Sequence, residues 1–240
     1  MDWITIYIIA AVMIVPVFIY GAICQTRINR VYDEYIKVNA NSDVCAAEMA
    51  FKMLAKANVS GVNVVKANGR LTDCYDPRNK VIKLSTETYY SSSIAALGVA
   101  AHEVGHAIQH HKKNPLFTIR RFISPVVSFI SRAFLPIILL GSLLNVSLLM
   151  PALGYYMVYI GLIFYGSGLI FELITLPLEF NASKKALEYL KETETLNDYE
   201  LSKAREVLSA AAQTYVASLA STLLYFLRFL SVAMIFRDRD

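Results

Sequence analysis

The sequence predicts an α+β protein that is mostly helical, in which a globular region with a small β-hairpin or sheet is integrated with three or four transmembrane helices. Hydrophobic residues make up 56% of the 240 residues and charged residues 18%, which is too apolar for a soluble domain of this length. Several apolar runs are long enough to cross a bilayer. Between the first two of them lies a stretch of ordinary globular composition with helical and strand-like periodicity.

Charge and cysteine content argue against two other classes of protein. The net charge is +4, and the basic residues lie beside apolar segments instead of forming a tract with interleaved aromatic residues. Nucleic-acid binding is therefore not expected. The three cysteines, Cys24, Cys45 and Cys74, are odd in number and widely spaced, so they indicate neither a disulfide framework nor a CxxC metal site. They fit a reducing, cytosol-facing location.

Residues 1–24 are expected to form an N-terminal transmembrane anchor. The run 3–23 is apolar and about one bilayer span long, and it follows Asp2 without a basic segment. Three basic residues come after it, namely Arg27, Arg30 and Lys37. Because basic residues favour the cytoplasmic side, the N-terminus is predicted to lie outside. The alternative is a cleaved signal peptide, whose charge asymmetry would be the reverse.

Residues 25–121 are expected to form a cytoplasmic globular region. Ser42 and Asp43 are placed to cap a helix whose apolar residues recur at helical spacing. The segment 61–66 then alternates like a β-strand.

A hairpin and a long helix complete this region. Asp76-Pro-Arg-Asn79 is typical of a type I turn, so we expect 70–75 to pair with 80–84. One of the serines at 91–93 can then cap a helix that runs from 94 to 111.

Residues 122–178 are expected to form a transmembrane hairpin. Apolar runs at 133–150 and 152–171 are separated by Pro151, which is typical of a tight turn between two spans. Basic residues flank its cytoplasmic ends, Arg120, Arg121 and Arg132 on one side and Lys184 and Lys185 on the other. This asymmetry predicts the same orientation as the N-terminal anchor.

The C-terminal part divides into a charged helix and an apolar one. Residues 179–212 are expected to be cytoplasmic, and 213–240 to form an apolar helix. Arg228 lies in the middle of the apolar run, and an arginine at mid-bilayer costs about 3 kcal/mol on insertion scales. The run is therefore a fourth span, an interfacial helix or a helix packed on the globular region.

The segment His102-Glu103-Val-Gly-His106 has the HExxH pattern. In a helix, the four-residue step places both imidazoles on one face, where they can bind one tetrahedral Zn²⁺. Glu103 would then lie beside the open coordination position and act as a general base. The surrounding run 94–108 is otherwise uncharged, and burying these groups without a partner would be costly. The alternative is a solvated helix face that carries these residues by chance.

A catalytic zinc needs a third protein ligand. His110 and His111 lie too far along the same helix, since two turns correspond to about 12 Å. Glu172 and Glu179 are better placed, near the point where the apolar run ends. We favour Glu179, because it follows Thr175-Leu-Pro177, a sequence that kinks or restarts a helix. Ser183 comes one turn later and is either a supporting hydrogen-bond partner or a helix-surface serine.

Several blocks of the sequence resemble the YugP-type family of bacterial membrane zinc metallopeptidases. The resemblance implies a zincin-like fold with a gluzincin-like site, similar to that of the HtpX and CAAX-processing membrane proteases. In that site, His102 and His106 are ligands, Glu103 is the base and Glu179 is the third ligand. The blocks that carry the resemblance lie at 69–78, 84–85, 93–97, 101–109 and 176–183.

The resemblance also bears on the segment before the motif. In the family the position of Cys74 is usually histidine, so a role of that imidazole in substrate or metal contact does not carry over to this chain. Cys74 is itself a candidate zinc ligand of a resting state, a supporting residue or a substrate contact. Its neighbours Tyr75 and Asp76 are further candidates for support or substrate contact. The strand 80–84 is a candidate edge that binds an extended substrate by β-augmentation, with an ordinary sheet strand as the alternative.

These observations predict a zinc-dependent endopeptidase, with one Zn²⁺ per chain, that cuts membrane or membrane-proximal proteins on the cytoplasmic side of the cell membrane. The expected partners are a protein or peptide substrate and the lipid bilayer, and no nucleic acid. The alternative function is a non-catalytic, zinc-containing membrane scaffold or chaperone.

Overall fold

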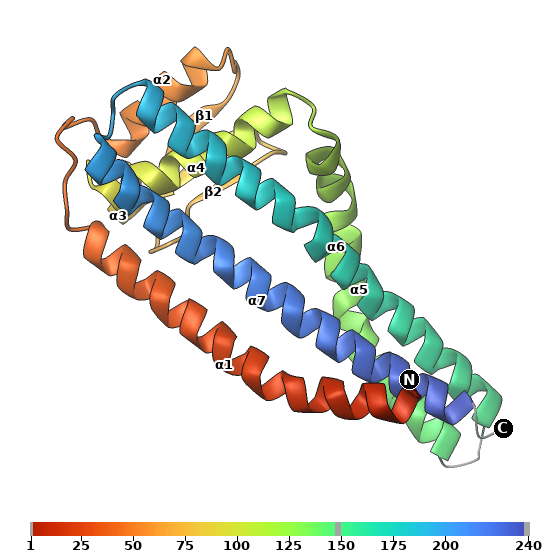
Figure 1. Cartoon of the computed structure of the whole chain (residues 1–240). Helices are drawn as coiled ribbons and strands as arrows, with labels where there is room; N and C mark the ends of the chain where they lie inside the picture. Colours follow the sequence, from red (N-terminus) through yellow and green to blue (C-terminus); the bar gives the residue numbers. More distant parts are fainter. Residues whose placement is uncertain (1, 147–149, 238–240) are drawn as a thin grey trace. The chain divides into compact units, whose positions relative to one another are not determined.

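The computed structural model describes residues 2–146 and 150–237 (Figure 1). The chain forms two compact units, and its long helices contribute to both of them. The first unit consists of residues 1–23, 119–175 and 215–240, and the second of 24–118 and 176–214. The first is the apolar unit, and the second contains the sheet and the HExxH helix.

The apolar unit is built from parts of four long helices, and these four meet the length and composition of a membrane span among the described residues. They carry large apolar side chains that face outward, such as Phe18, which is 74% exposed, and Phe129, which is 76% exposed. Such surfaces are expected to face lipid. The predicted mostly helical α+β fold with three or four candidate spans is confirmed. The helices are α1 (Trp3–Tyr35), α5 (Pro115–Val146), α6 (Pro151–Glu192) and α7 (Asp198–Arg237).

Within the apolar unit, α5 and α6 pack through small residues. A Cβ atom added at Gly154 would lie 2.5 Å from the carbonyl oxygen of Gly141, so the two backbones approach closely, as small residues allow in membrane helices. Arg228 of α7 lies with its guanidinium carbon 5.3 Å from the ring centre of Tyr7 of α1, and it donates to the Tyr7 hydroxyl at 3.4 Å. The arginine therefore has an aromatic and polar partner inside its own unit.

The second unit contains a three-stranded sheet with the order β1-β3-β2, formed by β1 (Asn63–Ala67), β2 (Cys74–Asp76) and β3 (Val81–Ser85). Strand β3 pairs in parallel with β1 and antiparallel with β2, so the predicted hairpin is confirmed, but its first strand is 74–76 instead of 70–75. Asp76 accepts hydrogen bonds from the backbone N–H groups of Arg78 and Asn79, which closes the turn. The prediction that 80–84 is an edge strand is wrong, because β3 is paired on both sides.

Three helices accompany the sheet: α2 (Ala46–Lys56), α3 (Thr86–Tyr89) and α4 (Ile94–His111). The hydroxyl of Ser93 accepts a hydrogen bond from the N–H of Ala96 at 3.2 Å, so the predicted cap of α4 is confirmed. The predicted cap of α2 is wrong. That helix starts after Cys45, without a side-chain cap, because Asp43 adopts a positive φ of 50° and ends the preceding turn.

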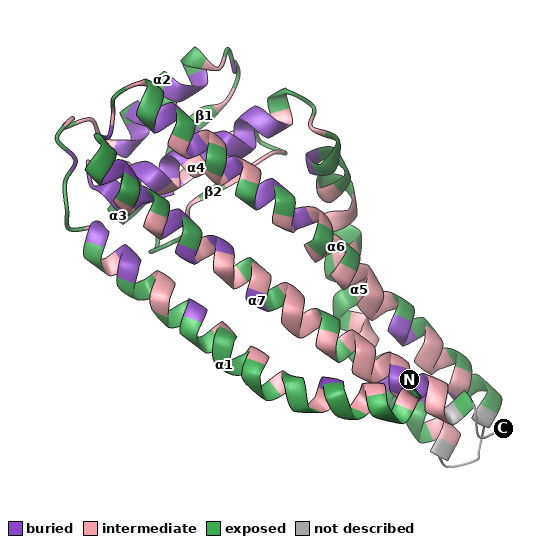
Figure 2. Ribbon diagram, viewed as in Figure 1, coloured by how far each residue is buried: buried purple, intermediate pink, exposed green. Residues whose placement is uncertain are grey.

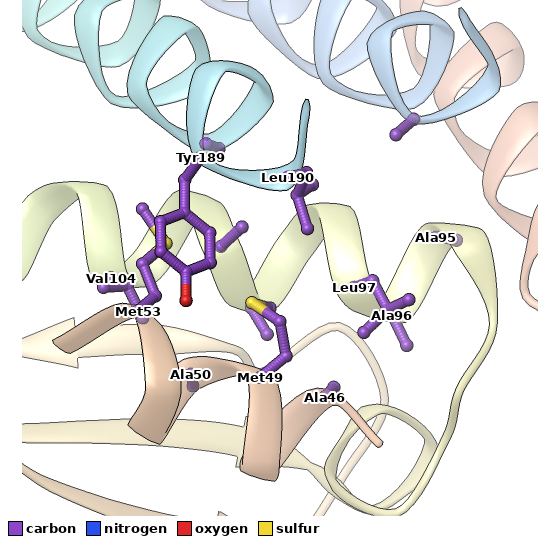
Figure 3. Close-up of a cluster of buried hydrophobic side chains, with 14 of the residues drawn as sticks. Ala46, Met49, Ala50, Met53, Ala95, Ala96, Leu97, Val104, Tyr189 and Leu190 are labelled. Carbon is purple, nitrogen blue, oxygen red and sulfur yellow. The ribbon is translucent and has the colours of Figure 1, made fainter. Parts of the chain in front are cut away.

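Helix α4 is the centre of the second unit, and Figure 2 shows most of its length buried. Side chains from α2, α4 and the end of α6 point into one apolar cluster (Figure 3). Met49 and Met53 of α2 are each 1% exposed, and Leu97 of α4 and Leu190 of α6 are fully buried. The motif helix is therefore held from several directions by close packing.

Two glycines of α4 set its distance from the neighbouring helices. A Cβ atom at Gly105 would lie 2.8 Å from the carbonyl oxygen of Ala182 in α6, whereas one at Gly98 would lie 3.6 Å from the Cβ of Ala204 in α7. The first contact requires glycine and the second does not.

Helix α6 continues through Pro177 without a restart, and α6 and α7 also run on across the boundaries predicted near 178 and 213.

The two glycines give a matched pair of substitutions. We expect Gly105→Ala to lower the free energy of unfolding by about 1–3 kcal/mol, because the methyl group would push α4 and α6 apart. Gly98→Ala should be neutral or stabilising by up to about 1 kcal/mol, because alanine is the better helix former. Thermal unfolding of the detergent-solubilised protein, followed by circular dichroism, checks both. Equal destabilisation by the two variants would contradict the close approach at Gly105.

Candidate metal centre

Helix α4 presents both histidines of the motif on one side. The rings of His102 and His106 are edge to face, with centroids 4.7 Å apart and an interplanar angle of 87°. The four-residue step along the helix produces this proximity. The surrounding helix is apolar and packed, so the imidazoles cannot be fully hydrated: the His102 side chain is 15% exposed and that of His106 is 9% exposed.

Glu179 of α6 completes a cluster with the two histidines. Its Oε2 lies 3.1 Å from Nε2 of His102 and 3.4 Å from Nε2 of His106, and its side chain is 2% exposed. The candidate ligand atoms of the three residues lie within 4.8 Å of one another, and no other such group of His, Cys, Asp or Glu occurs among the described residues. Two imidazoles and one carboxylate converging in this way can hold a tetrahedral divalent metal with one position open. Glu172, the other candidate, instead accepts a hydrogen bond from Ser218 in the apolar unit.

Glu179 and His106 shift each other's proton affinity. Burial alone would raise the pKa of Glu179, but hydrogen bonds from His102 and His106 hold that pKa well below its usual range. Burial alone would lower the pKa of His106, but Glu179, and secondarily Glu103, more than offset it, so the pKa of His106 lies above its ordinary value. A buried carboxylate thus stays ionised beside two imidazoles, and a metal that binds here has to displace the proton of His106, so metal binding is expected to depend on pH.

Ser183 supports the first histidine. Its hydroxyl oxygen lies 3.0 Å from Nδ1 of His102, one helical turn beyond Glu179 on α6. If Nδ1–H donates to this oxygen, then Nε2, which faces Glu179 at 3.1 Å, is the nitrogen that would bind a metal once it has lost its proton. The structure therefore brings Ser183 to His102, which is one of the two placements that the sequence left open.

Gln109 supports the second histidine, and the sequence did not single it out. Its amide nitrogen donates to the carbonyl oxygen of Leu178 at 2.9 Å and to Oδ1 of Asn181 at 3.0 Å. Because a carbonyl can only accept, the oxygen of the Gln109 amide must face His106, at 3.0 Å from Nδ1. That nitrogen then carries the proton, which leaves Nε2 available for a metal. The three-residue step from His106 to Gln109 is the signal that could have revealed this contact.

Glu103 lies beside the cluster but is not one of its three members. Its carboxylate accepts a hydrogen bond from the backbone N–H of Tyr75 on β2, at 2.7 Å, and the residue is 9% exposed. Cys74 is exposed on the same strand and lies outside the cluster, and its pKa is raised by partial burial and by the negative charge of Glu103. Asp76 closes the hairpin turn, and hydrogen bonding, chiefly from Asn79, lowers its pKa to about 2. Of these predicted residues, Tyr75 has the direct contact with Glu103.

Substitution of Gln109 tests the supporting role of this amide. Gln109→Met keeps the side-chain volume but removes the acceptor for His106 Nδ1, so we expect zinc affinity to fall about 10–100-fold, as for other residues that orient metal ligands. Gln25→Met, on the exposed part of α1, should leave the affinity unchanged. Competition with a chromophoric chelator measures the zinc affinity of both variants. Wild-type affinity in Gln109→Met would contradict the proposed orientation of His106.

Comparison with known proteins identifies the family of the chain. The family model described as "Putative neutral zinc metallopeptidase" matches residues 10–234. The protein described as "Putative membrane protease YugP" of Bacillus subtilis (strain 168) is 38% identical over 216 residues, which cover 90% of this chain and 92% of the relative. No solved structure matches the chain. By the extent of both matches, the chain belongs to the family of membrane proteins described as neutral zinc metallopeptidases.

Proposed function

We propose that this protein is a zinc-dependent endopeptidase of the cell membrane, with one Zn²⁺ per chain, that hydrolyses peptide bonds of membrane or membrane-proximal proteins. One observation carries the proposal: the candidate ligand atoms of His102, His106 and Glu179 lie within 4.8 Å of one another, and Glu103, the neighbour of His102 in the chain, is not part of that cluster. A structural zinc site uses four protein ligands, whereas a catalytic site uses three and keeps a carboxylate free for proton transfer.

The proposed chemistry divides the work between the metal and Glu103. When bound, zinc would polarise the scissile carbonyl group and acidify a water molecule. Glu103 takes the proton from the attacking water and delivers it to the nitrogen of the leaving amine. Ser183 and Gln109 keep the two imidazoles in the required tautomer and orientation.

The segment 80–84 does not act as a substrate-binding edge, because β3 is paired on both sides. Strand β2 does not supply that edge in its place, because its Tyr75 N–H donates to the carboxylate of Glu103.

We propose that the chain is a multi-pass membrane protein with its active site on the cytoplasmic side. Supporting evidence comes from basic residues that follow the first apolar run and flank the central pair of runs, since such residues concentrate on the cytoplasmic side. The four candidate spans support a multi-pass arrangement, because four crossings would leave residues 24–118 and 176–214 on the same side of the bilayer.

Glu103→Gln tests the enzymatic proposal. The amide cannot take a proton from water, so we expect the variant to keep one zinc per chain while peptide cleavage falls by about 10²–10⁴-fold. Glu188→Gln, at an exposed glutamate of α6, should cleave like the wild type. Metal analysis and cleavage of a co-reconstituted membrane-anchored substrate give the two readouts. Zinc-loaded wild-type protein that cuts no membrane or unfolded substrate would instead favour the non-catalytic scaffold.

Single-cysteine labelling tests the proposed orientation. In a chain that lacks its native cysteines, we expect Ser60→Cys to react with an impermeant maleimide only after the cells are lysed, because residue 60 is exposed and predicted to be cytoplasmic. Met150→Cys, between α5 and α6, should react in intact cells. The reverse labelling pattern would overturn the cytoplasmic site.

A further inference from the structure

Tyr75 contacts α4 through both its backbone and its side chain. Its backbone N–H donates to Oε2 of Glu103 at 2.7 Å, and its phenol oxygen lies 2.7 Å from Nδ1 of His110. The two contact points on α4 are seven residues apart, so they lie on one face of the helix, separated by about two turns or roughly 10 Å. One residue of the sheet therefore bridges a long stretch of the motif helix.

The imidazole of His110 is itself held in place. The ring of Phe117, at the start of α5, is stacked on it with centroids 5.4 Å apart and an interplanar angle of 27°. The same phenylalanine ring lies 6.4 Å from the ring of Tyr75, and Phe117 is 6% exposed. His110 is thus a fixed anchor for the phenol group.

Glu103 needs such an external constraint. The terminal torsion of a glutamate side chain is broad, so the helix alone does not fix the orientation of the carboxylate. A short hydrogen bond from a backbone donor determines which carboxylate oxygen is held and which way the other one faces. This donor belongs to β2, a strand of three residues that is paired on one side only, so β2 by itself is a weak support.

We propose that Tyr75 and His110 form a brace that positions the general base. The phenol–imidazole hydrogen bond holds β2 against α4, and β2 in turn keeps the Tyr75 N–H on the Glu103 carboxylate. Both are positioning residues that act through Glu103 and do not touch the reacting atoms. This inference rests on the proposed peptidase function, and it gives a role to a histidine that follows the HExxH motif and lies outside the metal cluster.

The brace predicts a specific kinetic pattern. Tyr75→Phe and His110→Phe should each lower kcat about 10–100-fold and change KM less than about twofold, because a displacement near 1 Å at the catalytic group has a cost of this size. The double variant should be no slower than the slower single variant, since both remove one hydrogen bond. His110→Gln retains a partner for the phenol and should recover part of the activity. His111→Phe, at the exposed neighbouring histidine, is the matched control and should equal the wild type.

A phenol that acts directly on the substrate would give a different pattern. Tyr75→Phe would then lose activity while His110→Phe kept it, and the brace would be refuted. Additive losses in the double variant would refute it as well. Zinc content is measured in every variant, and a drop that parallels the loss of kcat would mean that the residues support the metal site instead.

Amide hydrogen exchange provides a readout that does not depend on activity. In Tyr75→Phe and His110→Phe, the amides of residues 73–77 should exchange faster than in the wild type, whereas His111→Phe should leave their rate unchanged. If the wild type cleaves no substrate but these exchange rates change as expected, the proposed function fails and the structural brace stands. If the wild type is active and neither kcat nor the exchange rates change in the variants, the brace fails alone.

Discussion

The close approach of α4 and α6 at Gly105 is the constraint on which the candidate centre depends. Ala182 lies against that glycine, and its neighbours on α6 include Glu179 and Ser183, which contact His102. A Cβ atom at position 105 would lie 2.8 Å from the carbonyl oxygen of Ala182, so a larger residue would push the two backbones apart and lengthen these hydrogen bonds. The absence of a side chain at Gly105 therefore allows the close approach that brings the three candidate ligands of α4 and α6 together.

Burial then determines the chemistry of the cluster. A carboxylate and two imidazoles are held inside an apolar core, where each unpaired polar atom would cost stability. The structure meets this cost with hydrogen bonds from the same two helices: Ser183 pairs with His102, and Gln109 pairs with His106 while its amide nitrogen binds Leu178 and Asn181. These contacts satisfy polar groups, and they also select the imidazole nitrogens that face Glu179.

Local patterns explain why much of the fold could be predicted. The apolar runs, the Asp76 turn and the bounds of α4 depend on residues close together in the chain, and the structure confirms them. Strand order depends on pairing between segments that are not adjacent in the chain. Because β1 pairs with β3 across a crossover, the segment 80–84 belongs to a central strand and not to the predicted edge strand. The predicted cap of α2 was wrong because Asp43 adopts a positive φ of 50° and the helix begins only after Cys45.

The sequence by itself determined the motif, the helix that carries it and the presence of long apolar helices, since helical periodicity and hydropathy are properties of consecutive residues. Only the tertiary structure decided which glutamate lies beside the histidines, which amide orients His106 and which backbone N–H binds Glu103. Those partners are separated by 77 residues for His102 and Glu179 and by 28 for Tyr75 and Glu103. Contacts over such separations are set by how helices and strands pack, and no local pattern encodes them.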